Sequence, residues 1–224
     1  MDNMDFTFVR EVLPFWDELG IAEQSLLRDR MIRLDFEAGM SVHSGGDCSG
    51  LVIVKRGQLR TYILSEGGRE ITLFRLFERD VCVLTSSCIM KNITFDIHAE
   101  AEKESEVYLI PTEVFRQLDE ANMAVKSFTA EIIASRLSDV MWVIEQVVFM
   151  SLDRRLASFL LDLSSIEGSM DLPITHDAIA RNIGSAREAV TRMLRYFQSE
   201  GMVALSRGRV RLTDHKKLQR LASG

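Results

Sequence analysis

Arginine side chains recur at helical spacing in the segment that follows Gly184. At about 100° per residue, the apolar side chains of this segment fall on one side and most of the polar ones on the other. Guanidinium groups donate paired hydrogen bonds to guanine O6 and N7, and a carboxylate accepts one from cytosine N4. The polar side is therefore predicted to read base edges in a DNA major groove, and we call it the reading face: Arg187, Glu188, Thr191, Arg192 and Arg195.

The residues before the reading face indicate a first helix and a tight turn. Thr175 is a residue type that caps helices, Gly184 suits a sharp turn, and Gly201 suits the end of a second helix. Ser185 and Glu188 have the spacing of a capping box, in which both side chains bind orphan amides at a helix start. The pattern predicts a helix-turn-helix with Thr175 and Ser185 also at the DNA interface.

A short basic hairpin follows the predicted helix-turn-helix. Residues 206–211 contain three arginines around one glycine, and we expect Arg207 and Arg209 to contact phosphate groups, which supply much of the affinity for DNA. The alternative is that all these arginines only solvate the protein surface and that Glu188 only caps its helix. Two adjoining helices with glycine at the turn favour the DNA-binding interpretation.

The net charge of −6 would argue against a nucleic-acid partner, but it is unevenly distributed. Residues 151–224 hold 12 lysines and arginines against 8 aspartates and glutamates, which gives +4, whereas residues 1–150 hold 15 against 25, which gives −10. Such asymmetry indicates a polyanion partner for the basic part. No apolar run approaches the roughly 20 residues that span a bilayer, and the acidic N-terminus does not resemble a signal peptide. We therefore expect a cytoplasmic protein without a membrane partner.

The elements that precede this basic segment are of a different kind. Residues 30–110 contain short strand-like runs separated by glycines, and residues 93–101 alternate apolar and polar side chains as a half-buried strand does. Residues 11–29 indicate one or two short helices, and residues 112–118 a further one. We expect an α+β chain whose N-terminal part is a double-stranded β-helix, that is, a jelly-roll or β-roll barrel.

Residues 121–149 contain neither glycine nor proline and predict a helix of about 28 residues, roughly 42 Å long. Its apolar side chains recur at near-heptad spacing, so the helix either packs on its own barrel or forms a dimer seam. We expect a homodimer, with Val125 and Phe128 as possible extensions of a seam built from Ile133, Val140, Ile144 and Val147. A helix near residues 152–164 and a loop at 168–173 follow.

Several short motifs agree with those of one family. In the C-terminal part they are Ile-Ala-x-x-x-Gly at 179–184 and Arg-Glu-x-Val-x-Arg at 187–192. Looser matches in the barrel are Val-x-x-Gly-x-Leu at 54–59 and Glu-Val-x-x-Ile-Pro at 106–111. From about Leu13 to Leu221 the chain thus resembles the Crp/Fnr family of bacterial transcription regulators.

The resemblance implies three parts: a cyclic-nucleotide-binding-like β-roll sensor over residues 1–120, a dimerisation helix over residues 121–150 and a winged helix-turn-helix over residues 151–224. It also implies base contacts by Arg187, Glu188 and Arg192. The implied function is sequence-specific DNA binding without enzymatic activity. The implied partners are a second copy of the chain, a two-fold symmetric double-stranded DNA site and, for an activator, RNA polymerase.

The sensor part departs from the family members that bind cyclic nucleotides. Those members carry a Gly-Glu pair and then an Arg-Ser or Arg-Thr pair that holds the cyclic phosphate. The corresponding residues 77–90 lack Gly-Glu, and Phe95 and Asp96 stand at the second pair. Because an aspartate repels a phosphate, we do not expect cyclic AMP to bind. No cysteine precedes Cys48, which excludes the N-terminal cysteine cluster of the iron–sulfur members.

The signal that the sensor detects stays open at this point. Cys82 and Cys88 are either inert core thiols or a redox- or metal-linked pair. Haem with His43 or His98 as axial ligand, or a small organic effector, is also compatible with the sequence. The candidate sensor residues are Cys82, Cys88, Phe95 and Ile97; the cofactor is unknown, and no metal site is predicted. The alternative function is a nucleotide- or metal-binding jelly roll, such as a cupin-like enzyme, without a DNA role.

Overall fold

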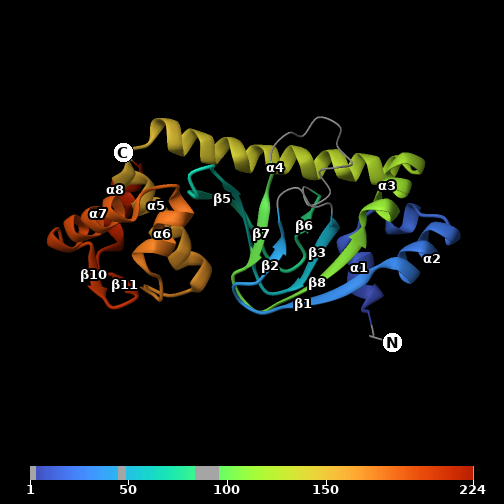
Figure 1. Ribbon diagram of the computed structural model, residues 1–224, viewed down its shortest axis with the longest axis horizontal. Helices are drawn as coiled ribbons and strands as arrows, with labels where there is room; N and C mark the ends of the chain where they lie inside the picture. Colours follow the sequence, from blue (N-terminus) through green and yellow to red (C-terminus); the bar gives the residue numbers. More distant parts are fainter. Residues whose placement is uncertain (1–3, 45–48, 84–95, 224) are drawn as a thin grey trace. The chain divides into compact units, whose positions relative to one another are not determined.

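The computed structural model describes most of the chain, in three stretches: residues 4–44, 49–83 and 96–223. By its internal contacts the chain divides into two compact units, drawn in Figure 1. Unit 1 consists of residues 1–63 and 73–140, and unit 2 of residues 64–72 and 141–224. Unit 1 holds most of the strands, and both units contain several short helices, so the α+β fold class is confirmed.

Unit 1 begins with three short helices: α1 (Phe6–Val12), the 3-10 helix η1 (Trp16–Glu18) and α2 (Ile21–Arg30). Helix α1 starts after Asp5 because the Asp5 carboxylate accepts a hydrogen bond from the Phe8 amide at 3.1 Å. The sequence predicted helices over residues 11–29. That prediction is right for α2 but places the first helix too late.

The described strands of the barrel form two sheets (Figure 1). The order in the first sheet is β1 (Ile32–Phe36), β8 (Ser105–Pro111), β3 (Gly50–Arg56) and β6 (Val81–Cys82). The order in the second is β2 (Ser41–His43), β7 (His98–Ala101), β4 (Leu59–Leu64) and β5 (Glu70–Leu76). Of the strand predicted over residues 93–101, the part from His98 is confirmed, and residues 96–97 precede the strand. Residues 93–95 lie outside the described part.

The core of unit 1 lies between the first sheet and the helices. Leu51 and Ile53 of β3 and Tyr108 of β8 are fully buried against apolar side chains of α1, α2 and α3 (Thr112–Ala121). Val52 and Val54 are buried as well, so both faces of β3 are covered. At roughly 25 cal/mol per Å², burial of this apolar surface is the main stabilising contribution.

Ion pairs between arginine and glutamate side chains connect neighbouring segments of the second sheet. Arg60 Nη1 of β4 lies 2.8 Å from Glu100 Oε1 of β7, its partner in the register, and Arg75 Nε lies 2.7 Å from Glu102 Oε2. The Arg60 side chain is only 3% exposed. Since removal of one partner would leave a charge in a water-poor environment, these pairs are costly to break and help to fix the register.

Helix α4 (Met123–Phe149) is the long helix that the sequence predicted. It is separated from α3 by Asn122, whose side-chain oxygen caps α4 by accepting a hydrogen bond from the Ala124 amide at 2.9 Å. Val125 and Phe128 are buried in the core of unit 1, so neither is available to extend a dimer seam. The first part of α4 therefore packs on the barrel of its own chain.

Among the described residues, no helix combines the length and apolar character that a membrane span requires.

Unit 2 contains α5 (Leu152–Glu167), β9 (Asp171–Leu172), α6 (His176–Ile183), α7 (Arg187–Ser199), β10 (Val203–Ser206), β11 (Arg209–Leu212) and α8 (His215–Ser223). The side chains at its centre come from every helix and from the sheet, and include Leu156, Leu160, Leu172, Ile179, Val190, Leu194, Phe197, Val210 and Leu218. The segment 168–173, predicted to be a loop, contains β9, which pairs antiparallel with β11. The loop prediction failed because a strand of two residues is too short to show a periodic pattern in the sequence. Its pairing with β11 can be recognised only in the folded structure.

Candidate nucleic-acid interface

Helices α6 and α7 form the predicted helix-turn-helix. The Thr175 hydroxyl accepts a hydrogen bond from the Ala178 amide at 3.1 Å, so Thr175 caps α6 as predicted. Gly184 ends α6 with φ of +64°, a conformation that L side chains rarely adopt. The space beside this turn is limited, since a Cβ atom at Gly184 would stand 2.9 Å from Cδ1 of Ile71, which belongs to the same unit.

The capping box predicted for the second helix is wrong. Helix α7 begins at Arg187, its N-cap residue is Ala186, and no side chain caps it. The Ser185 amide instead donates to the Ala180 carbonyl at 3.0 Å, which draws Ser185 into the turn after α6. Glu188 is consequently the second helical residue. Its charge still faces the positive end of the helix dipole, which is favourable.

The two sides of α7 separate as predicted. Val190, Leu194 and Phe197 are fully buried in the centre of unit 2. On the reading face Arg187, Glu188, Arg192 and Arg195 are exposed and Thr191 is half-buried. Within the part of the chain that the structure describes, the three arginines form no hydrogen bond or ion pair, so their guanidinium groups are available to a ligand.

His176, which the sequence analysis did not single out, joins the two helices. Its ring nitrogen Nδ1 lies 3.1 Å from the Thr191 hydroxyl oxygen on the reading face. Burial lowers the pKa of the His176 imidazole below its usual value, and the positive charges of Arg187 and Arg195 lower it further. A single histidine directly after a helix cap carries no periodic signal that could have identified it.

The β10–β11 hairpin is the predicted wing, and its two arginines differ in their surroundings. Arg207 is exposed in the turn, and among the described residues it has no polar partner. Arg209 donates two hydrogen bonds, of 3.2 and 3.0 Å, to the Asp171 carboxylate of β9. These bonds hold the pKa of Asp171 below its usual value. Arg209 therefore connects the wing to β9 through Asp171. The sequence analysis identified neither this role of Arg209 nor the involvement of Asp171.

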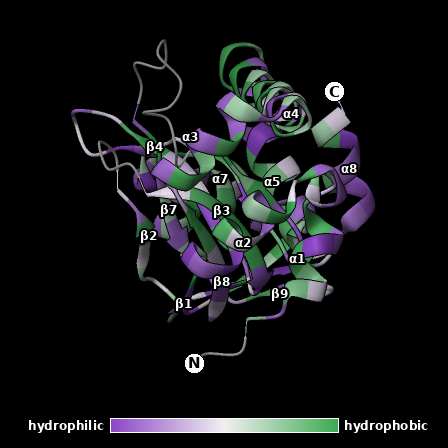
Figure 2. Cartoon of the chain, turned by 90° about the vertical axis from the view of Figure 1, so that its right-hand side faces the viewer, coloured by the Kyte–Doolittle hydropathy of each residue, from purple (hydrophilic) through white to green (hydrophobic). Residues whose placement is uncertain are grey.

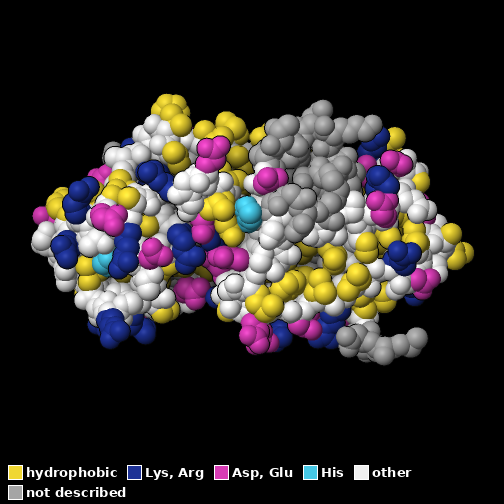
Figure 3. All heavy atoms as spheres, in the orientation of Figure 1, with side chains coloured by type: hydrophobic (Ala, Val, Ile, Leu, Met, Phe, Trp, Pro, Cys, Tyr) yellow, Lys and Arg dark blue, Asp and Glu magenta, His cyan; other side chains and the backbone are white. Residues whose placement is uncertain are grey.

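The half-buried guanidinium of Arg155 binds the C-terminal end of α6. Arg155 of α5 donates a hydrogen bond of 3.0 Å to the Ile183 carbonyl, which has no partner within the last turn of its helix. Burial lowers the pKa of Arg155. Figure 3 shows lysine and arginine side chains gathered on the left of the view, over α6, α7 and the wing. Unit 2 therefore presents a helix face and a hairpin, both basic, on a rigid support.

The predicted dimerisation residues lie on α4, but their exposure differs. Ile144 and Val147 are 46% and 45% exposed, and Ile133 is half-buried against the core of unit 1. Val140 is half-buried. Figure 2 shows hydrophobic residues along much of α4. Leu137, which belongs to the same predicted apolar stripe, is exposed, and the second half of the helix also exposes large apolar side chains that the sequence did not point to, among them Met141, Trp142, Val148 and Phe149.

The candidate sensor residues are only partly described. Cys82 is fully buried on β6 and Ile97 is 2% exposed, while Cys88 and Phe95 lie outside the described residues. His43 Nδ1 lies 2.9 Å from the Ser49 hydroxyl, and the His98 ring stacks on Tyr62. In the described stretches no group of three potential metal ligands comes together.

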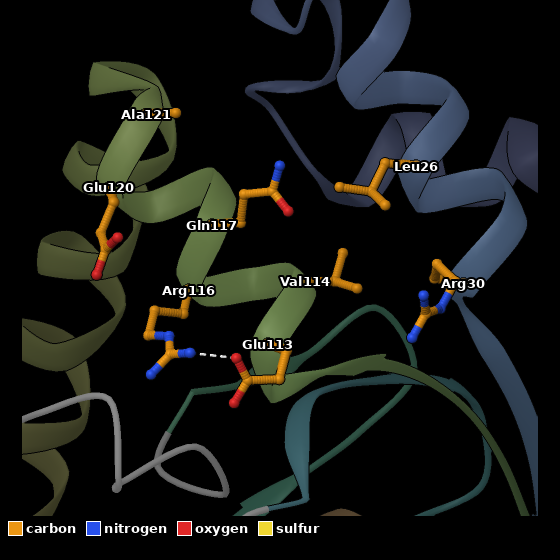
Figure 4. Close-up of a pocket in the computed structure, with 8 residues that line it drawn as sticks. All are labelled: Leu26, Arg30, Glu113, Val114, Arg116, Gln117, Glu120 and Ala121. Carbon is orange, nitrogen blue, oxygen red and sulfur yellow. Dashed lines mark hydrogen bonds and ion pairs between the residues drawn. The ribbon is translucent and has the colours of Figure 1, made fainter.

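A groove of about 580 Å³ with a mixed polar and apolar lining lies between α2 and α3. Figure 4 shows Leu26 and Arg30 on the side of α2 and Val114, Glu113 and Arg116 on the side of α3, the last two joined by an ion pair. The groove lies outside the two sheets of the barrel and includes none of the candidate sensor residues.

Residues 154–221 match the model of the Crp-like helix-turn-helix domain. A solved structure from Eubacterium rectale ATCC 33656, assigned to the Crp/Fnr family of transcriptional regulators, is 49% identical, with a TM-score of 0.93 over 96% of this chain and 100% of that one. A Crp/Fnr-family regulator from Thermus thermophilus is 25% identical, with a TM-score of 0.68 over 86% of this chain and 99% of that one.

A curated relative of similar length is the global nitrogen regulator of Synechococcus elongatus. It is 27% identical over 207 residues, which are 89% of this chain and 91% of the relative. The likeness thus includes the barrel and the long helix as well as the helix-turn-helix.

Proposed function

The chain belongs to the Crp/Fnr family of transcription regulators and carries a helix-turn-helix DNA-binding domain, and we propose that it works as a homodimer that reads a two-fold symmetric DNA site. The proposal rests above all on the reading face. Its three arginines are exposed and available, while the opposite side of α7 is fully buried. A helix of this kind fits a major groove and presents donors for guanine.

Within this proposal the side chains divide their roles. Arg187, Glu188 and Arg192 contact base edges, with Thr191 and Arg195 beside them. Thr175, Ser185 and Arg207 lie around the reading face and contact the sugar–phosphate backbone, which sets the register of the protein on DNA. Arg209 acts mainly through Asp171, because the double hydrogen bond between them holds the wing in place.

The second half of α4 is the proposed dimer seam. Ile144 and Val147 expose apolar surface at helical spacing, with Trp142 and Phe149 nearby in the sequence. Large apolar side chains that are exposed together on one helix mark an interaction surface. Two copies of α4 packed along this surface would place two reading faces on one DNA site, as a two-fold symmetric operator requires.

The β-roll is the proposed sensor of an unidentified effector or redox signal, over residues 1–120, with α4 transmitting the signal to residues 151–224. Burial of Cys82 favours a packing role for that thiol. In an activator, RNA polymerase would be a further partner. The cytoplasm is the compartment that a DNA-binding regulator requires.

Selection of bound sequences from a random DNA library tests the proposed function. The parent protein is expected to enrich a palindrome with half-sites about one helical turn apart, of the TGTGA or TTGAT kind. Arg192→Ala should lose the enrichment. Arg220→Ala, which removes an exposed arginine of α8, should keep it. A selection that enriches no sequence with the parent protein, at any salt concentration at which it binds, contradicts the proposal.

A further inference from the structure

His176 occupies the junction between the two helices of the proposed DNA-reading motif. It is the first residue of α6, next to the capping residue Thr175, and its side chain reaches Thr191 on α7. The Nδ1 to Oγ1 distance of 3.1 Å is that of a hydrogen bond in which either atom can be the donor. The imidazole thus contacts one of the five residues of the reading face directly.

We propose that His176 is a further DNA-interface residue, which takes up a proton when the reading face meets DNA and thereby turns the Thr191 hydroxyl into a hydrogen-bond donor toward the DNA. This inference rests on the proposed function. It adds a titrating group and a proton-linked affinity to a surface whose other cations are arginines, which stay charged throughout the neutral pH range.

The charges around His176 set its state in the free protein. Burial lowers the pKa of the His176 imidazole below its usual value, and the positive charges of Arg187 and Arg195 on α7 lower it further, so the surroundings in the free protein favour the neutral ring. On its own helix, the Asp177 carboxylate pairs with Arg181 at 3.7 Å.

The other charged groups packed on α6 face its far end. Arg155 of α5 binds the Ile183 carbonyl, and Glu70 of the segment 64–72 lies 4.0 Å from Arg181. The positive charges of α7 therefore dominate the surroundings of the imidazole.

DNA reverses this balance. Phosphate groups near Arg187 and Arg195 neutralise the two positive charges that disfavour the imidazolium ion and add negative charge of their own. The pKa of His176 is then higher in the complex than in the free protein. A group with a higher pKa in the complex binds a proton on association, so affinity for DNA rises as the pH falls through the histidine range.

The proton also changes what Thr191 offers. When His176 is neutral with its hydrogen on Nε2, Nδ1 accepts the hydrogen bond of the Thr191 hydroxyl, and only lone pairs of Oγ1 face outward. When His176 is protonated, Nδ1 donates to Oγ1, and the hydroxyl hydrogen becomes free to bind an acceptor on a phosphate or a base. Phosphate oxygens are acceptors only, so they favour the forms in which Nδ1 carries a hydrogen, and of these the imidazolium ion is the one that their negative charge stabilises.

Fluorescence anisotropy with the full chain and a labelled duplex of random sequence at low salt measures this linkage, because non-specific binding needs no knowledge of the operator. Affinity of the parent protein is expected to rise about three- to tenfold between about pH 8 and about pH 6, as uptake of up to one proton allows. In His176→Gln, whose amide can still bind Thr191 but does not titrate in this range, the rise should disappear. His215→Gln is the matched control in the same unit and should titrate like the parent.

Two substitutions at Thr191 test the role of its hydroxyl. Thr191→Ser keeps the hydroxyl and should keep the rise at low pH, whereas the isosteric Thr191→Val should lose the part of the rise that depends on the hydroxyl hydrogen and keep the part that comes from the charge of the imidazolium ion. The inference is overturned if His176→Gln titrates like the parent, or if Thr191→Val does. A parent protein that binds no duplex at any pH would instead contradict the proposed function, so the two failures are distinguishable. Thermal unfolding of each variant identifies any loss of the fold itself.

Discussion

Two independent features at Gly184 disfavour a side chain there. Its φ of +64° is a left-handed conformation, and a Cβ atom would contact Ile71 Cδ1 at 2.9 Å. We predict that Gly184→Ala lowers the free energy of unfolding by roughly 1–2 kcal/mol for the backbone conformation alone, with a further loss if Ile71 cannot move. Denaturant unfolding measures the effect. Gly67→Ala, at a glycine with open space and no left-handed backbone, is the control and should leave stability nearly unchanged.

Glu188 has lost its predicted capping role, and this sharpens the prediction for its substitution. Because Glu188 caps no amide with its side chain, Glu188→Ala should affect stability only through the helix dipole, by less than about 1 kcal/mol. Its effect on DNA recognition should be larger: the preference for one base at a single position of the DNA site should weaken by roughly 1–3 kcal/mol. Selection from random DNA measures this. Unchanged preferences at every position would remove Glu188 from the base-reading set.

Arg207 and Arg209 differ although only one residue separates them. Arg207 is exposed in the turn of the wing, while Arg209 is bound twice to Asp171. We predict that Arg207→Ala weakens binding to all sequences about equally and lowers the salt dependence by about one phosphate contact. Titrations of specific and random duplexes over a range of salt concentrations measure both quantities. A change in base preference with an unaltered salt slope would contradict the phosphate role.

At the scale of elements, the two halves of α4 differ in their surroundings. Its first part is bound into unit 1 by Val125 and Phe128, and its second part exposes Ile144, Val147 and their apolar neighbours. The sequence left open whether this helix packs on its own barrel or forms a seam. The first interpretation holds for the N-terminal part, and the second stays a prediction for the C-terminal part.

Val140 lies between these two parts, and we predict that Val140→Glu dissociates the dimer and abolishes specific DNA binding at the same time. A buried carboxylate in an apolar seam is costly, and operator affinity needs both half-sites. Light scattering gives the oligomeric state, and anisotropy gives the affinity. Ser138→Glu places the same charge on an exposed position on another side of α4 and should preserve both properties. A parent protein that is monomeric in solution would contradict this prediction.

For the molecule as a whole, the proposed sensor in the β-roll is expected to control when the reading face binds DNA. Residues 77–90 lack the Gly-Glu pair of cyclic-nucleotide-binding members, and an aspartate stands in the place of a phosphate-binding side chain. We predict that millimolar cyclic AMP or cyclic GMP leaves the melting temperature unchanged. A ligand at 100 times its Kd would add about 2.7 kcal/mol to stability, so binding would be plain in a thermal-shift measurement. A melting temperature that rises with the concentration of the nucleotide would show that the β-roll binds cyclic nucleotides and would contradict this prediction.

The sequence by itself determined the parts of this protein that depend on local signals. The cap at Thr175, the turn at Gly184, the two sides of α7 and the unbroken α4 follow from residue type and from periodicity over a few turns. These features fixed the helix-turn-helix, and with the motif likeness they indicated the family.

Only the tertiary structure decided the contacts between distant segments. Asp171 holds Arg209 from 38 residues away, Arg155 binds the Ile183 carbonyl across 28, and His176 meets Thr191 across 15. The start of α7 was also decided by the folded structure. The Ser185 amide donates a hydrogen bond to the Ala180 carbonyl, and Ser185 does not form the capping box that its spacing from Glu188 predicted. Such pairs have no spacing that repeats along the chain. Each forms only when a packed core has brought two elements together, and the free energy of that packing, not the local pattern, selects the partner.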